Sequence, residues 1–301
     1  MLSAGRQEED GAAIRRAYWM MHACVLLWGL TAILGKLISI AALPLVLWRL
    51  VLVLGCLALL PACWRGLRGL SAAQWGRAAL AGVFVSLHWW TFYAAIKLAN
   101  ASVAVACMAV TPIFLSVLEP WLTKRPFRAL ELALGALAMP GVWLVVGGSP
   151  PEMNLGVAVG LLSSLLVAMF STLNKTLARD VDPFTLTAIE FGAGALLLLG
   201  IGLLLPPPTW WPEPRDWLWL SLLASACTLV PFVLAILAMR SLSAWAVHLV
   251  INLEPVYAIA LAVLFLGEGA ELQPPFYWGT ALLILVTFVS ARLSRARSAG
   301  R

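Results

Sequence analysis

Long runs of apolar residues alternate with short polar links along the whole chain, and proline or glycine marks many of the links. A helix needs about 20 apolar residues to cross the hydrocarbon of a bilayer. Ten runs approach that length, and they are residues 17–38, 43–62, 74–97, 101–123, 128–147, 155–178, 183–205, 216–239, 244–266 and 274–293. This pattern predicts an all-α polytopic membrane protein with ten transmembrane helices.

Composition supports the same class. Of the 301 residues, 62% are hydrophobic and 11% are charged, whereas a soluble domain carries about a quarter charged residues. The net charge of +6 is spread over short loops, so we expect no nucleic-acid partner. The five cysteines lack a CxxC spacing, which argues against a disulfide framework or a zinc site. We expect neither a metal nor a cofactor.

The basic residues predict how the chain is oriented. With the N-terminus inside, fifteen of the twenty Lys and Arg residues fall on the cytoplasmic side. Lys97 and Arg215 fall outside, and Lys36, Arg49 and Lys175 lie within spans. Because Lys and Arg favour cytoplasmic loops, we predict a multi-pass protein of the cell (inner) membrane with both termini cytoplasmic.

An internal repeat relates the two halves. Aligning Pro112 with Pro255, at an offset of 143 residues, places Lys97 on the equally basic Arg240. The other matches are Ala101 with Ala244 and Leu118 with Leu261 at this offset, and Lys36 with Lys175 and Pro44 with Pro183 at an offset of 139. Five spans, an odd number, separate the copies, so the halves should be inverted. Inverted repeats are a recurring architecture of secondary transporters.

The repeat divides the chain into five parts. Residues 1–16 form a cytoplasmic tail, 17–147 the first five-helix repeat and 148–154 an extracytoplasmic linker. Residues 155–293 form the second five-helix repeat, and 294–301 form a basic cytoplasmic tail. None of the links is long enough for a separate soluble domain.

Polar residues inside the spans are candidates for a substrate cavity, because an ionisable group at the bilayer centre costs about 2.5–3.5 kcal/mol without a partner or a wet cavity. The predicted cavity residues are His88, Trp89, Tyr93, Thr111, His248, Asn252 and Glu254. His88 could equally be a packed residue among aromatic side chains. Glu254 gives the sharpest signal, because Pro255 interrupts the helix beside it. Pro112 is the matching helix break in the first half.

A second set of residues predicts an intramembrane charge network, and it comprises Lys36, Arg49, Asn174, Lys175 and Glu190. Either lysine could instead extend its side chain to the interface. Arg49 suits an ion pair as well as a substrate contact, and Glu190 is a natural partner for a cation such as Lys175 or Arg49. Glu119 is expected to pair with the nearby Lys124 and Arg125 for structural reasons.

Several motifs, taken in order, identify a family. They are WGLTAILGK at 28–36, WR at 48–49, FYAAIKLANASVAVACMAVTPIF at 92–114, LNK at 173–175 and INLEPVYAIALAVLFLGE at 251–268. With them the chain resembles the EamA-type ten-helix permeases of the drug/metabolite transporter superfamily. The resemblance implies two inverted five-helix halves around a central cavity lined by helices one, three, four, six, eight and nine. It also implies alternating access. Lys124 and Arg125 depart from the Gly-Glu pair expected at the end of the fourth helix.

The resulting hypothesis is a secondary transporter for a small organic metabolite, with export of amino acids or related compounds favoured. Mid-span cations mixed with Glu190 and Glu254 favour a zwitterionic or neutral solute, and proton coupling could use either acid or a histidine. Efflux of drug-like cations is the alternative within transport. An intramembrane lipid-processing enzyme is the alternative from another class, although HExxH, Walker A and GxSxG motifs are absent. The partners are the solute and the lipid bilayer, and the sequence leaves monomer and homodimer open.

Overall fold

The structure is a computed structural model that describes residues 2–137, 139–147, 150–207, 209–251, 253–267, 269, 273–282, 285–286 and 289. It contains no strand among these residues. The elements of the first half are α1 (Leu2–Leu37), α2 (Ala42–Ala58), α3 (Pro61–Leu67), α4 (Ala72–Leu98), α5 (Ala101–Cys107), η1 (Met108–Val110), α6 (Thr111–Thr123), α7 (Ala129–Ala136) and α8 (Met139–Gly147). Those of the second half are η2 (Pro151–Met153), α9 (Asn154–Leu177), α10 (Pro183–Leu204), α11 (Pro214–Ala224), the π-helical η3 (Ser225–Leu229), α12 (Val230–Met239), α13 (Ala244–Ile251) and α14 (Glu254–Leu266). Residues 274–282 are helical as well.

The all-α membrane class is confirmed by the apolar helices. Within the described residues, six segments are long and apolar enough to cross a membrane, and they are Gly11–Leu37, Ala72–Leu98, Ala101–Thr123, Pro151–Leu177, Pro183–Leu204 and Pro214–Met239. Ala42–Ala58 and Tyr257–Leu266 are shorter apolar helices. The predicted spans 128–147 and 244–266 are each divided between two helices, and only part of 274–293 is described. The total of ten therefore stays a prediction.

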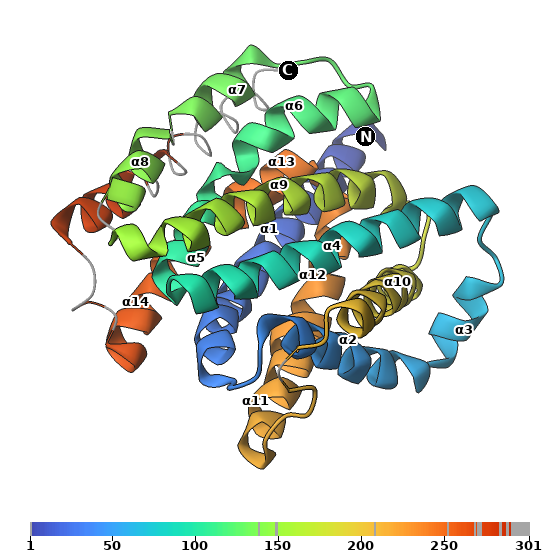
Figure 1. Ribbon diagram of the computed structural model, residues 1–301. Coiled ribbons are helices and arrows are strands. Elements are labelled where there is room, and N and C mark those ends of the chain that lie inside the picture. Colours follow the sequence, from blue (N-terminus) through green and yellow to red (C-terminus); the bar gives the residue numbers. More distant parts are fainter. Residues whose placement is uncertain are drawn as a thin grey trace.

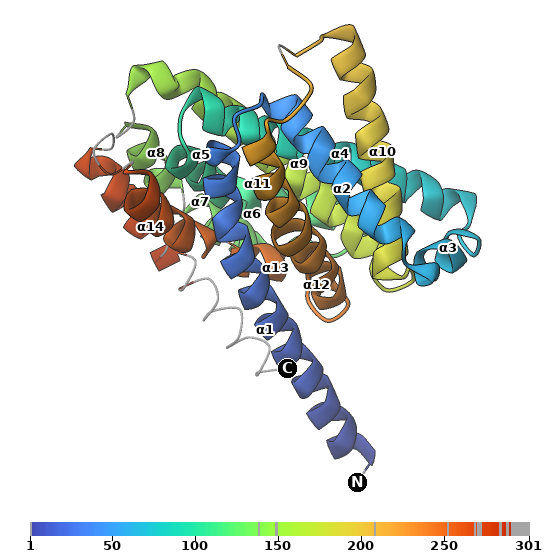
Figure 2. The same ribbon diagram turned by 90° about the horizontal axis from the view of Figure 1, so that it is seen from below.

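Two pairs of helices form the framework of the molecule. In Figures 1 and 2, α4 packs along α9, and α1 packs along α12. The pair α4 and α9 is antiparallel, because Gly156 near the start of α9 lies against Ala95 and Ala99 at the end of α4. The C-terminal ends of α4 and α9 therefore lie at opposite ends of the bundle.

Glycines bring α10 unusually close to α4. A Cβ atom added to Gly82 of α4 would lie 2.1 Å from the backbone oxygen of Glu190, and one added to Gly194 of α10 would lie 2.8 Å from Cβ of Ser86. Small residues of this kind allow helix backbones to approach closely in a membrane. The crossing fixes the position of Glu190 at its centre.

Both repeat prolines open a new helix. Pro112 lies in the first turn of α6 and Pro255 in the first turn of α14, where a missing N–H removes no helical hydrogen bond. The two helices also end alike, at Lys124 with φ of 55° and at Gly267 with φ of 71°. These positions are related by the repeat offset of 143. The left-handed end is thus kept in the first half although its glycine is absent.

We predict that Lys124→Gly raises the stability of the protein, because the left-handed conformation costs a residue with a Cβ about 1–2 kcal/mol. Gly267→Ala should lower stability by a similar amount. The measurement is the midpoint of thermal unfolding of purified protein, with Gly76→Ala as the control, since its Cβ meets nothing within 4 Å. A lower midpoint for Lys124→Gly would contradict the prediction.

Candidate functional site

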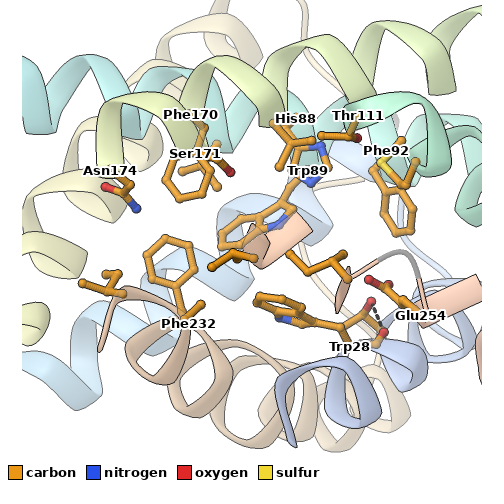
Figure 3. A pocket seen from close by; sticks show the side chains of 18 of the residues that line it. Trp28, His88, Trp89, Phe92, Thr111, Phe170, Ser171, Asn174, Phe232 and Glu254 are labelled. Carbon is orange, nitrogen blue, oxygen red and sulfur yellow. Dashed lines mark hydrogen bonds between the residues drawn. The ribbon is translucent and has the colours of Figure 1, made fainter. Parts of the chain in front are cut away.

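A cavity of about 100 Å³ lies between the pair α1 and α12 and the pair α4 and α9 (Figure 3). A single buried water needs only about 10–15 Å³ of such space, so there is room for a small organic group. Aromatic rings make up much of the wall, and they belong to Trp28, Trp89, Phe92, Phe170 and Phe232. Figure 3 shows Asn174 and Glu254 on opposite sides of this aromatic cluster.

The helical repeat explains how the wall is built. Three helices each present four residues at spacings of three and four, which places them on one helix face. These sets are Val85, His88, Trp89 and Phe92 on α4, Val167, Phe170, Ser171 and Asn174 on α9, and Phe232, Ala235, Ile236 and Met239 on α12. The rings of Phe170 and Phe232 stack across the cavity with centroids 5.5 Å apart.

Arg49 supplies a buried guanidinium to the cavity wall. Its Nε donates to Thr228 Oγ1 at 2.6 Å, and its NH1 donates to Tyr93 Oη at 3.1 Å. The guanidinium lies 3.9 Å from the centroid of the Trp89 ring, within the range of a cation–π interaction. A guanidinium has five N–H donors, so these two bonds leave donors for another ligand.

A π-helical segment and a glycine hold the partners of Arg49 in place. Thr228 lies in the π-helical η3 and donates its own hydroxyl proton to Leu223 O, which leaves the oxygen to accept from Arg49. The Tyr93 ring fits against Gly35, where a Cβ would lie 2.3 Å from a ring carbon. The guanidinium is therefore fixed from two sides.

Glu254 brings a carboxyl group to the same cavity. It is 9% exposed, and it is the first residue of α14. No ion pair joins it to Arg49 or to any other cation in the described part of the chain. The cavity therefore contains a basic and an acidic group that are not paired with each other.

Serines of α9 connect the other polar wall residues. His88 Nδ1 lies 2.8 Å from Ser163 Oγ, and that hydroxyl donates to His88 O at 2.8 Å. Thr111 Oγ1 lies 3.0 Å from Ser164 Oγ, which donates to Cys107 O. His88 and Thr111 thus line the cavity while binding α9, which is the packed role that the sequence left open for His88.

The structure places most of the predicted cavity residues together. His88, Trp89, Thr111 and Glu254 line the cavity, whereas Tyr93 is fully buried behind Arg49. Asn252 lies outside the described residues, as do the side chains of His248 and Pro255. The sequence analysis did not select Trp28, Phe170, Ser171 and Phe232, although the spacing of three and four along the spans contained that signal.

The predicted charge network is not assembled as a unit. Lys36 is exposed at the end of α1, and Lys175 donates to backbone carbonyls. Arg49 binds Thr228 and Tyr93, so the expected pairing of Glu190 with Lys175 or Arg49 does not occur. Both cations instead donate hydrogen bonds to uncharged oxygen atoms. The ion pairs of the described residues join Arg125 and Arg128 to Glu119 and Glu131, in accord with the structural role expected for Glu119.

An all-α membrane protein with a cavity of this kind between two pairs of helices has the architecture expected of a membrane transporter. The chain belongs to the EamA-like transporter family, whose sequence profile matches twice, over residues 15–147 and 154–292. The two matches establish the two-repeat architecture.

Known relatives agree with this family. Over 278 residues the chain is 28% identical to Uncharacterized transporter YwfM of Bacillus subtilis (strain 168), covering 89% of this chain and 91% of that protein. Over 219 residues it is 27% identical to an uncharacterized transporter of Archaeoglobus fulgidus, covering 72% and 76%. A solved crystal structure with 19% identity superposes with a TM-score of 0.69 over 93% of this chain and 98% of its own, which supports the fold.

We predict that Tyr93→Phe lowers the stability of the protein, because it leaves a buried donor of Arg49 without its acceptor. The expected cost is about 1–3 kcal/mol, read from the midpoint of thermal unfolding. Tyr257→Phe is the matched control, since Tyr257 is 44% exposed. Equal midpoints for the two variants would show that the Tyr93 hydroxyl does not hold Arg49.

Proposed function

We propose that the protein is a secondary transporter that moves a small organic metabolite across the cell membrane by alternating access. We favour the export of amino acids or related compounds. The observation that supports this proposal is that different bonds hold the two ends of the cavity, where basic side chains of one helix bind the carbonyl groups that end another.

One end of the cavity is closed by reciprocal bonds between α9 and α12. Lys175 Nζ of α9 donates to Met239 O at 2.6 Å and also to Leu242 O. Arg240, at the end of α12, donates from Nε to Ala178 O at 2.9 Å and from NH2 to Val181 O at 3.4 Å. The last carbonyls of a helix lack intrahelical partners and favour cations. The two helix ends therefore bind each other.

The opposite end is held by a different set of bonds, in which Ser39 N and Ser39 Oγ donate to Asp216 of α11 at 2.9 and 2.6 Å. There Lys97 Nζ of α4 donates to Ile38 O, just beyond α1, at 2.5 Å, and among the described residues it is the one side-chain hydrogen bond that joins α4 to this end of α1. Lys36, the repeat counterpart of Lys175, is exposed. In the alternative conformer we expect Lys36 to bind carbonyls at the end of α4, while the bonds of Lys175 and Arg240 break.

The guanidinium of Arg49 and the carboxyl group of Glu254, which form no ion pair with each other in the described structure, support a zwitterionic solute. Arg49 can bind a carboxylate through its remaining donors, in a charge-assisted hydrogen bond, and Glu254 can accept from an ammonium group. The aromatic wall suits the apolar part of such a molecule. A drug-like cation could use Glu254 and the aromatic faces, but the buried guanidinium of Arg49 opposes a second positive charge.

The topology within the membrane is part of the proposal. We propose ten spanning helices in two inverted five-helix repeats, with the domain boundaries derived from the sequence. The protein then lies in the cell (inner) membrane with both termini in the cytoplasm. The antiparallel packing of α4 and α9 supports inversion, since α1 and its repeat counterpart α9 end at opposite sides of the cavity. This orientation places the Lys175 and Arg240 end at the cytoplasm. Proton coupling belongs to the same proposal, and we leave monomer and homodimer open.

We predict that a zwitterionic amino acid raises the thermal unfolding midpoint of the purified protein, because a ligand of the folded state stabilises it by mass action. At a concentration of 100 times Kd the gain is about 2.7 kcal/mol. Glu254→Gln should remove the shift, and so should omitting the amino group from the ligand.

Three other results would change the assignment. A shift with hydrophobic cations and none with amino acids would favour drug-like cation efflux. Conversion of a lipid to a new product by purified protein would favour the intramembrane enzyme. A shift that survives Glu254→Gln without loss would move the ammonium site away from Glu254.

We predict that Lys175→Met opens one end of the cavity. In a variant whose native cysteines are replaced, a thiol introduced by Ser171→Cys should react faster with a membrane-impermeant maleimide from the Lys175 side. Lys36→Met is the matched control and should leave this rate unchanged, because Lys36 is exposed and makes no hydrogen bond to another described residue in this conformer. Equal rates in both variants would contradict the assignment of Lys175 as part of the closed end.

A further inference from the structure

Two buried polar side chains beside the cavity have no hydrogen-bond partner in the part of the chain that the structure describes. Glu190 of α10 and Asn174 of α9 are both 0% exposed. Glu190 Oε1 and Oε2 and Asn174 Nδ2 and Oδ1 all lack a partner among the described residues. The Asn174 side chain is nevertheless close enough to Glu190 to interact with it. Buried polar atoms are nearly always hydrogen-bonded, so this pair requires an explanation.

No nearby cation supplies the missing partner of the Glu190 carboxyl group. Lys175 follows Asn174 in sequence but directs its Nζ to Met239 O and Leu242 O. The guanidinium of Arg49, on the neighbouring α2, is engaged with Tyr93 and Thr228. No ion pair involves Glu190 in the part of the chain that the structure describes. An ionised carboxylate at this place would be a buried charge without compensation.

Other titratable groups on the elements around α10 are turned elsewhere, and Arg65 of α3 and Arg77 of α4 are exposed. His88 of α4 contacts Ser163 of α9, and Cys63 of α3 donates to Phe184 O. Cys56 of α2 is exposed. Helix α12 contains no titratable residue. The backbone of Glu190 lies against Gly82 of α4.

The donors and acceptors of the pair match only when the carboxyl group carries a proton. An ionised carboxylate accepts hydrogen bonds but donates none, so Asn174 Oδ1 would face it without a donor. A protonated carboxyl can donate its O–H to Asn174 Oδ1 and accept from Nδ2 on its other oxygen. One proton and a small side-chain adjustment would then satisfy all four atoms that lack partners.

We infer that Glu190 and Asn174 form a proton-binding site, with the proton on the Glu190 carboxyl and the Asn174 amide as its hydrogen-bonded cover. Glu190 itself does not line the cavity, whereas Asn174 does. Rotation of the amide toward the cavity would open a path for the proton from the carboxyl oxygen to water there. The tight glycine crossing of α4 and α10 holds Glu190 in place, so Asn174 is the part that moves.

A role in coupling rests on the proposed transport function, but the existence of the site does not. Glu254 faces the cavity directly and is assigned to the solute, while Glu190 is covered. The two acids would then bind different cargoes, a proton at Glu190 and an ammonium group at Glu254. Solute binding could act on the proton site through the Asn174 side chain, which both sites share.

Infrared spectroscopy of the purified protein tests the site without any solute. At neutral pH the difference spectrum of wild type minus Glu190→Gln should contain the carbonyl stretch of a protonated carboxyl, and this band should shift in D₂O. As the pH rises the acid band should give way to carboxylate bands. Glu254→Gln is the matched control and should retain the Glu190 band.

A second variant keeps the test valid if Glu190→Gln fails to fold. Asn174→Leu removes the amide partner at similar size, and the acid band should move toward the frequency of a carboxyl without a hydrogen bond. The inference would be overturned if Glu190→Gln removed carboxylate bands at neutral pH instead of an acid band. So would an acid band that does not respond to Asn174→Leu. Neither result would affect ligand-induced stabilisation, which tests the transport proposal separately.

Discussion

The need to satisfy every backbone polar group within the protein governs this structure, because the hydrocarbon of a membrane offers no hydrogen bonds. Helices end or restart beside the cavity at several places, and each end leaves carbonyl groups without intrahelical partners. Lys97, Lys175 and Arg240 reach these carbonyls from neighbouring helices. The positions of the basic residues therefore follow from the helix ends, and the cavity is bounded by bonds that side-chain movements can make or break.

The cavity combines this framework with a fixed cation. Arg49 is stacked on Trp89 and bonded to Tyr93 and Thr228, so its position depends on α2, α4 and η3 together. Removal of a buried charge from water is tolerated only where such partners compensate it. Glu254 enters from α14, a helix that begins at the cavity. The site thus depends on helices from both repeats.

The helices and part of the cavity wall could be predicted from the sequence, because apolar length and helical spacing are local properties. The repeat offset likewise related Pro112 to Pro255 and Lys124 to Gly267, which share backbone positions. The partners of charged side chains could not be predicted. Lys175 was assigned to a charge network, yet it binds carbonyls of α12 and the link beyond it, and this depends on how two distant helices end side by side. The closeness of the Glu190 and Asn174 side chains likewise depends on three-dimensional information.

Helix α1 reaches from the cavity to a point outside the bundle of helices. Its 36 residues correspond to a length of about 54 Å at 1.5 Å per residue, well beyond the roughly 30 Å of bilayer hydrocarbon. Trp28 and Thr31 line the cavity near one end, and Figure 2 shows the other end projecting from the molecule. A straight helix of this length acts as a lever. A small tilt at the cavity becomes a larger displacement at the projecting end, where an attached fluorophore could report conformational changes without altering the cavity.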